Sequence, residues 1–93
     1  MKFTWDPDKA LSNFLKHGVD FEEAANVFYD PLAVKIEDRR HSETEDRFWM
    51  IGRSDSDRIL LVVFTERIGG LIRIISAHRA GREERKTYEN QSE

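Results

Sequence analysis

The stretch "ILLVVFTERIGGLIRIISAHR", residues 59–79, contains two candidate strands joined by a glycine turn. Its first six residues are all apolar, which is typical of a central strand packed on both faces. After the turn the pattern alternates, so that one side of the second strand carries Leu71, Arg73, Ile75, Ala77 and Arg79, and the other carries Ile72, Ile74, Ser76 and His78. An arginine inside such an apolar strand needs a partner or a ligand. The two strands together predict a sheet at the centre of the fold.

Three further strands are expected around this pair. Residues 2–5, "KFTW", form a short first strand, and residues 33–37, "AVKIE", alternate as a half-solvated strand does. Residues 47–53, "RFWMIGR", place Arg47, Trp49, Ile51 and Arg53 on one side. The polar segments "DRRHSETED" and "SDSD", residues 38–46 and 54–57, are interpreted as a loop and a turn.

Helices are expected at both ends of the chain. Asp6 as N-cap and Pro7 at the first helical position predict a helix that runs to about His17 and ends at Gly18. A capping box at residues 20–23 opens a second helix over residues 21–30. Both are amphipathic, with apolar side chains at helical spacing at Leu11, Phe14 and Leu15 and at Phe21, Ala24, Ala25 and Phe28.

A polar helix over residues 80–90 closes the chain, and Tyr88 is its only sizeable apolar residue. It has no apolar stripe to hold it, so it docks onto the body of the protein, is completed by a partner, or frays. The elements together predict an α+β domain, in which two N-terminal helices cover one face of a mainly antiparallel sheet.

The uncovered face of this sheet is expected to carry Arg47, Trp49, Arg53, Arg73 and Arg79. Basic side chains around an aromatic ring bind single-stranded RNA, with guanidinium groups on phosphates and the ring on a base. The alternative is that Trp49 belongs to the core and the arginines form a solvated rim.

At 93 residues the chain has room for one domain, residues 1–93, with a modest core. Its formal charge is −3, but residues 1–46 carry eleven acidic and six basic residues, whereas residues 47–93 carry seven acidic and nine basic residues. The absence of cysteine excludes disulfides and thiolate catalysis. No apolar run of membrane-spanning length and no export signal are present, so a cytoplasmic protein without a membrane partner is expected.

Three ordered sets of short motifs run along nearly the whole chain. They are "WD..K...N..KHGV.FEEA..VF.DP" from Trp5, "D..HSE.E.R...IG.S" from Asp38, and "R.LLVVFTER....RIISA..A...ER..YE" from Arg58. In these motifs the chain resembles the BrnT family of type II toxins, small RelE-like ribonucleases. The resemblance implies messenger RNA cleavage that inhibits translation and growth without a metal or other cofactor. It also implies neutralisation by a BrnA-type antitoxin, a ribbon-helix-helix protein. The toxin would contact operator DNA only through this antitoxin.

The segment after the last strand departs from the family pattern. That pattern has S-A-R, one variable residue and A-T, whereas this chain has "SAHRAG", with His78 at the arginine position and Gly81 at the threonine position. Arg79 is adjacent to His78 but is expected to point to the other side of the strand. Either this copy is weakened or engineered, or it relies on His78 as a proton carrier.

Metal-independent RNA cleavage needs a base for the 2′-hydroxyl, an acid for the leaving 5′-oxygen and a fixed cation near the phosphorus. Histidine suits the first two roles because its unperturbed pKa is about 6.5. The candidate catalytic residues are therefore His17, His41, Arg73, His78 and Glu84. The candidate RNA-binding residues are Lys16, Arg47, Trp49, Arg53, Arg79, Arg85 and Tyr88.

Each histidine also has a purely structural interpretation. His17, with Lys16, lies in the last turn of a helix, where the helix dipole favours any cation. His41 lies in a polar loop, where a solvated histidine is ordinary, and His78 fits a hydrogen-bonded histidine of the core. Glu84, with the arginines near it, fits a salt-bridged surface equally well.

Three classes of function fit the sequence. The ribonuclease toxin is favoured because the resemblance and the Arg/Trp face agree. A noncatalytic module that binds the antitoxin and co-represses its own operon is the alternative, since His78 replaces an expected arginine. A metallohydrolase that uses the three histidines is the third, although no H-x-x-x-H or similar spacing supports it.

Overall fold

The structure, a computed structural model, describes residues 1–41 and 45–91. Its elements follow one another in the order β1 (Lys2–Thr4), α1 (Pro7–His17), α2 (Phe21–Asn26), η1 (Val27–Tyr29), β2 (Val34–Asp38), η2 (Arg39–His41), β3 (Arg47–Arg53), β4 (Ile59–Arg67), η3 (Ile68–Gly70), β5 (Leu71–Arg79) and α3 (Arg82–Asn90), where η marks a short 3₁₀ helix. The predicted α+β class is confirmed.

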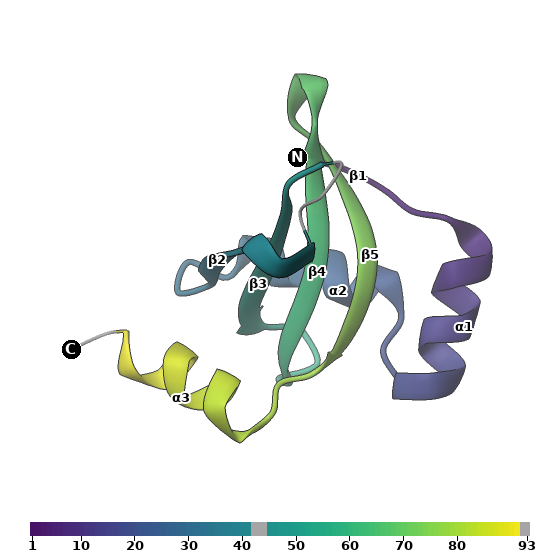
Figure 1. The fold of residues 1–93 in the computed structure, drawn as a ribbon. Coiled ribbons are helices and arrows are strands. Elements are labelled where there is room, and N and C mark those ends of the chain that lie inside the picture. The colour runs from purple at the N-terminus through teal and green to yellow at the C-terminus, as the bar shows by residue number, and fades with distance from the viewer. Residues whose placement is uncertain (42–44, 92–93) are drawn as a thin grey trace.

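The strands form one sheet in the order β1-β5-β4-β3-β2. β2, β3, β4 and β5 pair antiparallel in succession, whereas β1 pairs in parallel with β5. β4 is central, as its unbroken apolar run predicted, and Leu60, Leu61, Val62 and Phe64 are all buried. Figure 1 shows α2 behind the sheet and α1 beside β5, with α3 at the lower end of the strands.

The main core lies between the sheet and α2. Its buried members are Val19, Phe21, Ala24, Val27, Leu60, Val62, Phe64, Ile72, Ile74 and Ala77. Successive residues of a strand point to opposite faces, so Leu61 points the other way and packs with Ile51 and Tyr88 in a smaller cluster. One face of the sheet is therefore covered by helices, and the other is covered only in part.

α1 begins and ends where the sequence predicts. Asp6 Oδ1 accepts a hydrogen bond from the N–H of Asp8 at 2.9 Å, and Pro7 is the first helical residue. Gly18 ends the helix with a φ of 70°, a left-handed conformation that glycine adopts without strain.

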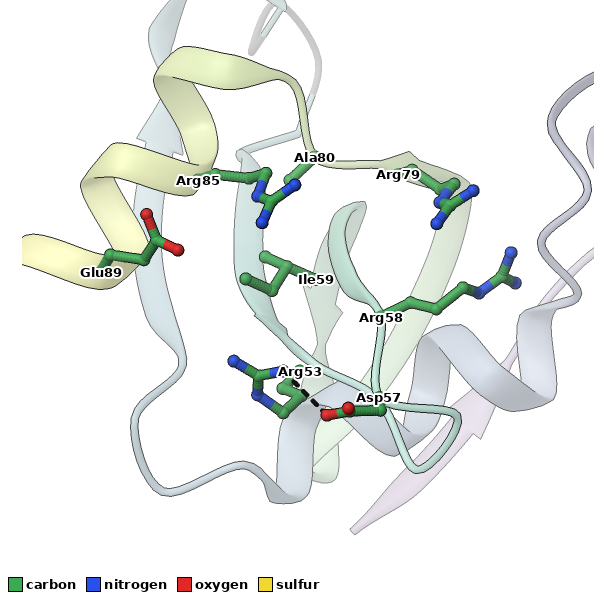
Figure 2. Close-up of a pocket in the computed structure, with 8 residues that line it drawn as sticks. All are labelled: Arg53, Asp57, Arg58, Ile59, Arg79, Ala80, Arg85 and Glu89. Atoms are coloured by element: carbon green, nitrogen blue, oxygen red, sulfur yellow. Dashed lines mark hydrogen bonds and ion pairs between the residues drawn. The ribbon is translucent and has the colours of Figure 1, made fainter.

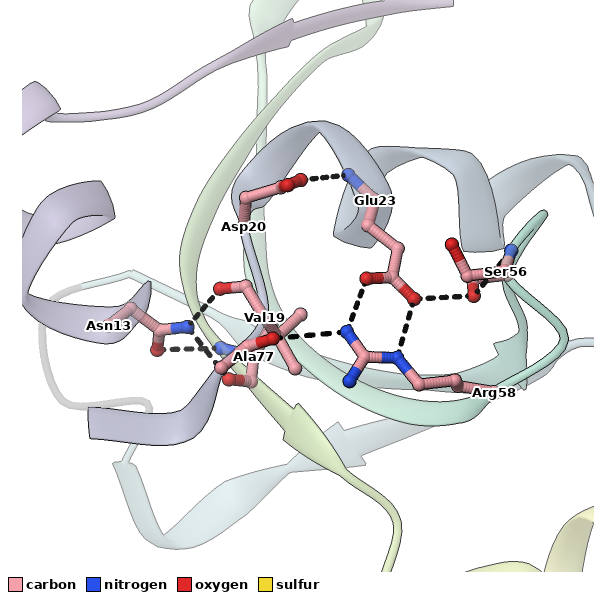
Figure 3. Close-up of polar contacts among 9 residues, drawn as sticks. Asn13, Val19, Asp20, Glu23, Ser56, Arg58 and Ala77 are labelled. Atoms are coloured by element: carbon pink, nitrogen blue, oxygen red, sulfur yellow. Dashed lines mark hydrogen bonds and ion pairs between the residues drawn. The ribbon is translucent and has the colours of Figure 1, made fainter. Parts of the chain in front are cut away.

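The packing of α1 differs from the expectation, because its apolar side chains lie in solvent and a polar one lies inside. The exposed residues are Leu11, Phe14 and Leu15. The buried residue is Asn13, whose Nδ2 donates to the carbonyl oxygens of Val19 at 3.0 Å and Ala77 at 2.8 Å, and whose Oδ1 accepts the Ala77 N–H at 3.1 Å (Figure 3). β1 pairs with only three residues of β5, so the Asn13 amide supplies hydrogen bonds further along that edge.

α2 is shorter than predicted, since the α-helix ends at Asn26 and continues as η1. Asp20 Oδ1 accepts the N–H of Glu23 at 2.7 Å, which is one half of the predicted capping box. The Glu23 carboxylate is instead bound by Arg58 and Ser54, so the tertiary structure replaces the other half.

β5 contains a β-bulge that the alternating sequence did not predict. Val63 of β4 pairs with Ser76, but the next residue, Phe64, pairs with Ile74, which leaves Ile75 between the two pairs. One extra residue shifts the alternation of the strand by one position.

The bulge overturns two predictions. Ala77 and Arg79 share the helix-covered side with Ile74, whereas Arg73 shares the opposite side with His78. The prediction that Arg73 and His78 lie on opposite sides of the strand is therefore wrong. The prediction that Arg79 lies on the same side as Arg73 is also wrong. We call the side that carries Arg73 and His78 the open face.

α3 is held to the rest of the protein by one aromatic side chain. Tyr88 is 6% exposed, packs against Ile51 and Leu61, and donates a hydrogen bond from Oη to Asp30 Oδ2 at 2.6 Å. The same carboxylate oxygen accepts the backbone N–H of Arg53 at 2.8 Å. Of the outcomes that the polar sequence left open, docking onto the body is the one observed.

A glycine at position 52 lets Asp30 approach β3 this closely. A Cβ atom on Gly52 would lie 2.8 Å from Val27 Cγ1 and 3.0 Å from Ala33 Cβ. Such contacts are too short for close-packed atoms, so any side chain would push η1 and the following turn away from the sheet. The Asp30 carboxylate would then lose its place beside Tyr88.

Candidate functional site

The open face presents three rows of side chains that are paired across β3, β4 and β5. The rows are Ile51, Leu61 and His78; Trp49, Val63 and Ser76; and Arg47, Thr65 and Arg73. α3 covers the first row through Tyr88, whereas Trp49, Ser76 and Arg73 are half-buried. Arg53 pairs with Ile59 and lies on the same side of β3 as Ile51, so the prediction that Arg47, Trp49, Arg53 and Arg73 share one face is confirmed.

Two histidines and a glutamate meet at the edge of this face, where α1, β5 and α3 converge. The ring centroids of His17 and His78 are 5.7 Å apart, and His78 Nε2 lies 3.7 Å from Glu84 Oε1. Glu84 Oε1 also accepts the N–H of Gly81 at 2.7 Å, which fixes the carboxylate in the first turn of α3. We call His17, His78 and Glu84 the histidine cluster. Imidazole and carboxylate side chains are the usual proton carriers of acid–base catalysis.

Trp49 belongs both to the core and to the open face. Its ring packs against the cluster of Ile51, Leu61 and Tyr88, and its Nε1 donates to Asp38 Oδ2 at 3.1 Å. These contacts fix the orientation of the ring, so its exposed part is a rigid surface of the kind on which a base stacks. The interpretation of Trp49 as a core residue is confirmed in part, and its stacking on a base stays a prediction.

Arg73 lies at the other end of the open face from the histidine cluster. Their partners on β4, Thr65 for Arg73 and Leu61 for His78, are four positions apart. At a rise of about 3.3 Å per residue this separation is about 13 Å. The row of Trp49 lies between the two sites.

Four arginines line a pocket of about 230 Å³ beside α3, where β3 and β5 end and β4 begins (Figure 2). Its lining residues are Arg53, Asp57, Arg58, Ile59, Arg79, Ala80, Arg85 and Glu89. Arg53 and Arg58 already have carboxylate partners, whereas Arg79 and Arg85 are exposed and form no salt bridge within residues 1–41 and 45–91. Guanidinium groups left without a carboxylate suit an anion such as phosphate. We call this site the arginine pocket.

α3 separates the arginine pocket from the histidine cluster. At 100° per residue, Glu84 and Arg85 flank the inward-pointing Tyr88 on its two sides. Glu84 faces His78, and Arg85 faces the pocket (Figure 2). The sequence assigned the arginines of β3 and β5 to one face, whereas the structure places them in two sites.

Arg58 is a site residue that the sequence analysis missed. Its Nε donates to Glu23 Oε2 at 3.0 Å, its Nη2 donates to Glu23 Oε1, and Nη2 also donates to the Gly18 carbonyl oxygen at 3.1 Å (Figure 3). The hydrogen bond from Arg58 holds the pKa of Glu23 below its usual value, although burial opposes this shift. The pair joins α2 to the residue that precedes β4. Glu23 and Arg58 are 35 positions apart, so no local sequence pattern predicts their contact.

Two predicted site residues lie outside both sites. Tyr88 is buried, so its ring cannot stack on a base. Lys16 lies on the outer surface of α1 beside Leu11 and Leu15. The side chain of His41, which belongs to η2, lies outside what the structure describes.

A metal site needs several ligands around one point. Among the residues that the structure describes, no group of histidine, aspartate and glutamate side chains is arranged to hold a metal ion. The same part of the chain contains no helix that is long and apolar enough to cross a membrane.

This fold is that of a known ribonuclease toxin. The 1.1 Å crystal structure of the BrnT toxin of Brucella abortus matches with a TM-score of 0.69 and 25% identity, over 88% of this chain and 99% of that chain. A comparison with curated proteins gives no match. Residues 5–84 match the family described as the ribonuclease toxin BrnT of a type II toxin-antitoxin system. The chain belongs to the BrnT family of ribonuclease toxins, as its sequence motifs indicated.

Membership of this family has two direct consequences. Toxins of this family are ribonucleases, and a toxin of a type II system has an antitoxin as its partner. The matched region contains the whole histidine cluster and ends at Glu84, before Arg85 and Tyr88.

Proposed function

We propose that this chain is a cytoplasmic, metal-independent endoribonuclease that cleaves messenger RNA and thereby inhibits translation and growth. The histidine cluster is the observation that carries this proposal. Two imidazoles with centroids 5.7 Å apart, and a carboxylate oxygen 3.7 Å from one of them, supply proton carriers without a metal. Family membership supports RNA as the substrate.

Cleavage begins when a base removes the proton of a 2′-hydroxyl group. The 2′-oxygen then attacks the adjacent phosphorus, the bond from phosphorus to the 5′-oxygen breaks, and an acid protonates that oxygen. The products are a 2′,3′-cyclic phosphate and a 5′-hydroxyl end. The base and the acid each contribute about 10²- to 10⁴-fold. His17 and Glu84 lie on either side of His78 and carry these two protons.

His78 occupies the centre of the cluster, where the family pattern has an arginine. When protonated, its imidazole supplies positive charge to the oxygens of the reacting phosphate, which accumulate negative charge in the transition state. An imidazole is charged only at the lower end of the physiological pH range, whereas a guanidinium is charged throughout it. His78 is therefore a weaker substitute for arginine in this role.

The RNA lies along the open face and passes over α3. Trp49 stacks on a base, and Arg73 holds a phosphate beyond it, about 13 Å from the reacting one by the rise of the strand. Arg79 and Arg85 hold a phosphate on the other side of α3, in the arginine pocket, where neither forms a salt bridge within residues 1–41 and 45–91.

The antitoxin is a BrnA-type ribbon-helix-helix protein that binds over the open face. The complex binds operator DNA through this antitoxin. Masking is the simplest form of inhibition for a small enzyme whose catalytic groups lie at an exposed edge. RNA titrated against the preformed complex should be neither bound nor cleaved. Undiminished cleavage by the complex would contradict masking.

The substitution at His78 favours a second function. A copy without the arginine of the family pattern cleaves RNA slowly or not at all. Because it retains the fold, it still binds the antitoxin and co-represses its operon. Growth after induced expression separates the two functions, since only the ribonuclease arrests growth.

The purified protein and a short end-labelled RNA test the enzymatic proposal. We expect cleavage that persists in excess EDTA, leaves 2′,3′-cyclic phosphate ends and is lost in His17→Ala. Inhibition by EDTA would contradict metal independence. If the unmodified protein neither cleaves RNA nor arrests growth, its function is that of the interaction module.

A further inference from the structure

The outer surface of α1 carries an apolar stripe that no other part of the described ranges, 1–41 and 45–91, covers. Its members are Leu11, Phe14 and Leu15, with exposed fractions of 61%, 48% and 76%. Leu32 and Ile68 are also exposed, but each lies in a different part of the fold. Contiguous large apolar side chains on a soluble protein mark a surface for a binding partner, because water solvates such a patch poorly.

The stripe cannot turn inward, because the opposite side of α1 is fixed to β5. Asn13 makes three hydrogen bonds at 2.8 to 3.1 Å, two to Ala77 and one to Val19. Rotation of the helix would break these bonds and leave buried polar groups without partners, at a cost of about 1 to 3 kcal/mol for each group. The outward orientation of the stripe is therefore a stable property of the fold.

The charges beside the stripe indicate the chemistry of what covers it. Asp8 and Lys16 line the same surface as Leu11 and Leu15, at opposite ends of the helix. Neither forms a salt bridge within the described ranges. A segment that brings an apolar face, an acidic side chain at Lys16 and a basic one at Asp8 complements this surface in both shape and charge.

The position of the stripe also relates it to the histidine cluster. His17, the last residue of α1, follows Lys16 directly and lies one turn beyond Phe14. A protein segment laid along α1 therefore reaches the ring of His17, whose centroid is 5.7 Å from that of His78.

We propose that the apolar stripe of α1 is the docking surface of the antitoxin, which covers it with an amphipathic segment that brings an acidic side chain to Lys16 and a basic one to Asp8. The type II family supplies the partner, and the inference rests on the proposed function only for the loss of RNA cleavage on binding. Docking at the stripe places the antitoxin beside His17, so that one contact both holds the partner and closes the active edge.

The test uses the full-length toxin and the antitoxin encoded with it, both purified, in a direct measurement of affinity. The double variant Leu11→Lys, Leu15→Lys should bind the antitoxin at least about 100-fold more weakly, since buried apolar anchors dominate the affinity of an interface. Leu32→Lys and Ile68→Lys make the same chemical change at exposed positions outside the stripe and should bind normally. Unchanged affinity in the double variant would overturn the proposal, as would equal losses in the two control variants.

Two further measurements keep the alternatives apart. Lys16→Glu should weaken binding and reduce its dependence on salt, whereas stronger binding by this variant would mean that the partner's side chain at Lys16 is not acidic. Sedimentation of the toxin alone should show a monomer. A dimer that dissociates on Leu15→Lys would assign the stripe to a second copy and overturn docking of the antitoxin.

RNA cleavage by the same variants distinguishes this inference from the proposed function. The double leucine variant should cleave RNA at the rate of the unmodified toxin and resist neutralisation by the antitoxin. If the unmodified toxin cleaves no RNA, the affinities still decide where the antitoxin docks, and only the proposed ribonuclease activity is lost.

Discussion

Tyr88 Oη and Asp30 Oδ2 lie 2.6 Å apart and join α3 to the body of the protein across 58 positions of the chain. Burial raises the pKa of Tyr88, and its hydrogen bond to Asp30 raises it further. Burial alone raises the pKa of Asp30 too, but hydrogen bonds from Tyr88 and from backbone N–H groups outweigh it and leave the pKa below its usual value. This contact is the buried part of the attachment of α3, the helix that brings Glu84 to His78 and Arg85 to the arginine pocket.

Tyr88→Phe should therefore destabilise the protein by about 1 to 3 kcal/mol, because it removes a donor from a partly buried carboxylate. Urea denaturation followed by circular dichroism measures the change. Tyr29→Phe removes a hydroxyl from a tyrosine that is 60% exposed and should leave the midpoint unchanged. Equal midpoints for the protein and Tyr88→Phe would show that the contact does not stabilise the docked helix.

The Arg58–Glu23 pair should make stability depend on acid pH. The pKa of Glu23 is lower in the folded protein than its usual value, so the unfolded chain binds more protons. The stabilisation is fully present above the pKa of an ordinary glutamate, about 4.3, and is lost as pH falls toward the folded value.

Glu23→Gln removes this pH-dependent stabilisation. It should cost about 1.5 to 3 kcal/mol near neutral pH, the range for hydrogen bonds to charged groups. The difference from the unmodified protein should shrink in urea titrations between pH 5 and 2.5. Glu22→Gln, at an exposed position in the same helical turn, is the control. A difference that stays constant over this range would contradict the role of the Glu23 charge.

Arg73→Ala should abolish growth arrest and leave the fold intact, because Arg73 is half-buried on the open face and has no salt bridge among the described residues. Growth after induced expression and circular dichroism of the purified variant are measured together. Arg39→Ala removes an arginine whose side chain is 86% exposed and should change neither. Loss of structure in Arg73→Ala would make Arg73 a structural residue rather than a ligand for RNA.

His78→Arg should raise the rate of RNA cleavage, because a guanidinium is always charged and its planar fork suits a phosphate. One such contact to a developing charge contributes about 10²- to 10³-fold. Rates of both proteins between pH 5 and 8 decide the role. If His78 carries a proton instead, the variant is slower and its pH profile loses one limb. Equal rates would place His78 outside the site.

Replacement of Arg79 and Arg85 together by glutamine should weaken RNA binding and reduce its dependence on salt. Each phosphate contact to a single strand contributes about 0.7 to the slope of log K against log salt concentration. If both guanidinium groups hold phosphates, the slope should fall by about 1.4 in fluorescence titrations. Arg40→Gln, at an exposed arginine outside the pocket, is the control. An unchanged slope would show that the arginine pocket does not contact RNA.

Much of the fold follows from signals that are local in the sequence. The apolar run of residues 59–64 identified the central strand, and Asp6 and Gly18 identified the two ends of α1. Such signals are readable because hydrogen-bond caps and side-chain alternation involve residues only a few positions apart. The motifs of the BrnT family likewise identified the class of protein before any contact was known.

The composition of the sites depended on contacts between distant residues. The bulge at Ile75 places Arg73 and His78 on one face, and an alternating pattern gives no sign of it. Asn13 turns the apolar stripe of α1 into solvent by binding Ala77, which is 64 positions away.

The sequence by itself therefore determined the strands, the helix ends and the family, because these depend on neighbouring residues and on motifs preserved in order. Only the tertiary structure decided which side chains meet. It brought His17 and Glu84 to His78, and it divided the predicted arginine face at α3. The physical reason is that one inserted residue in a strand, or one buried amide on a helix, reverses which side faces the core without changing the local pattern.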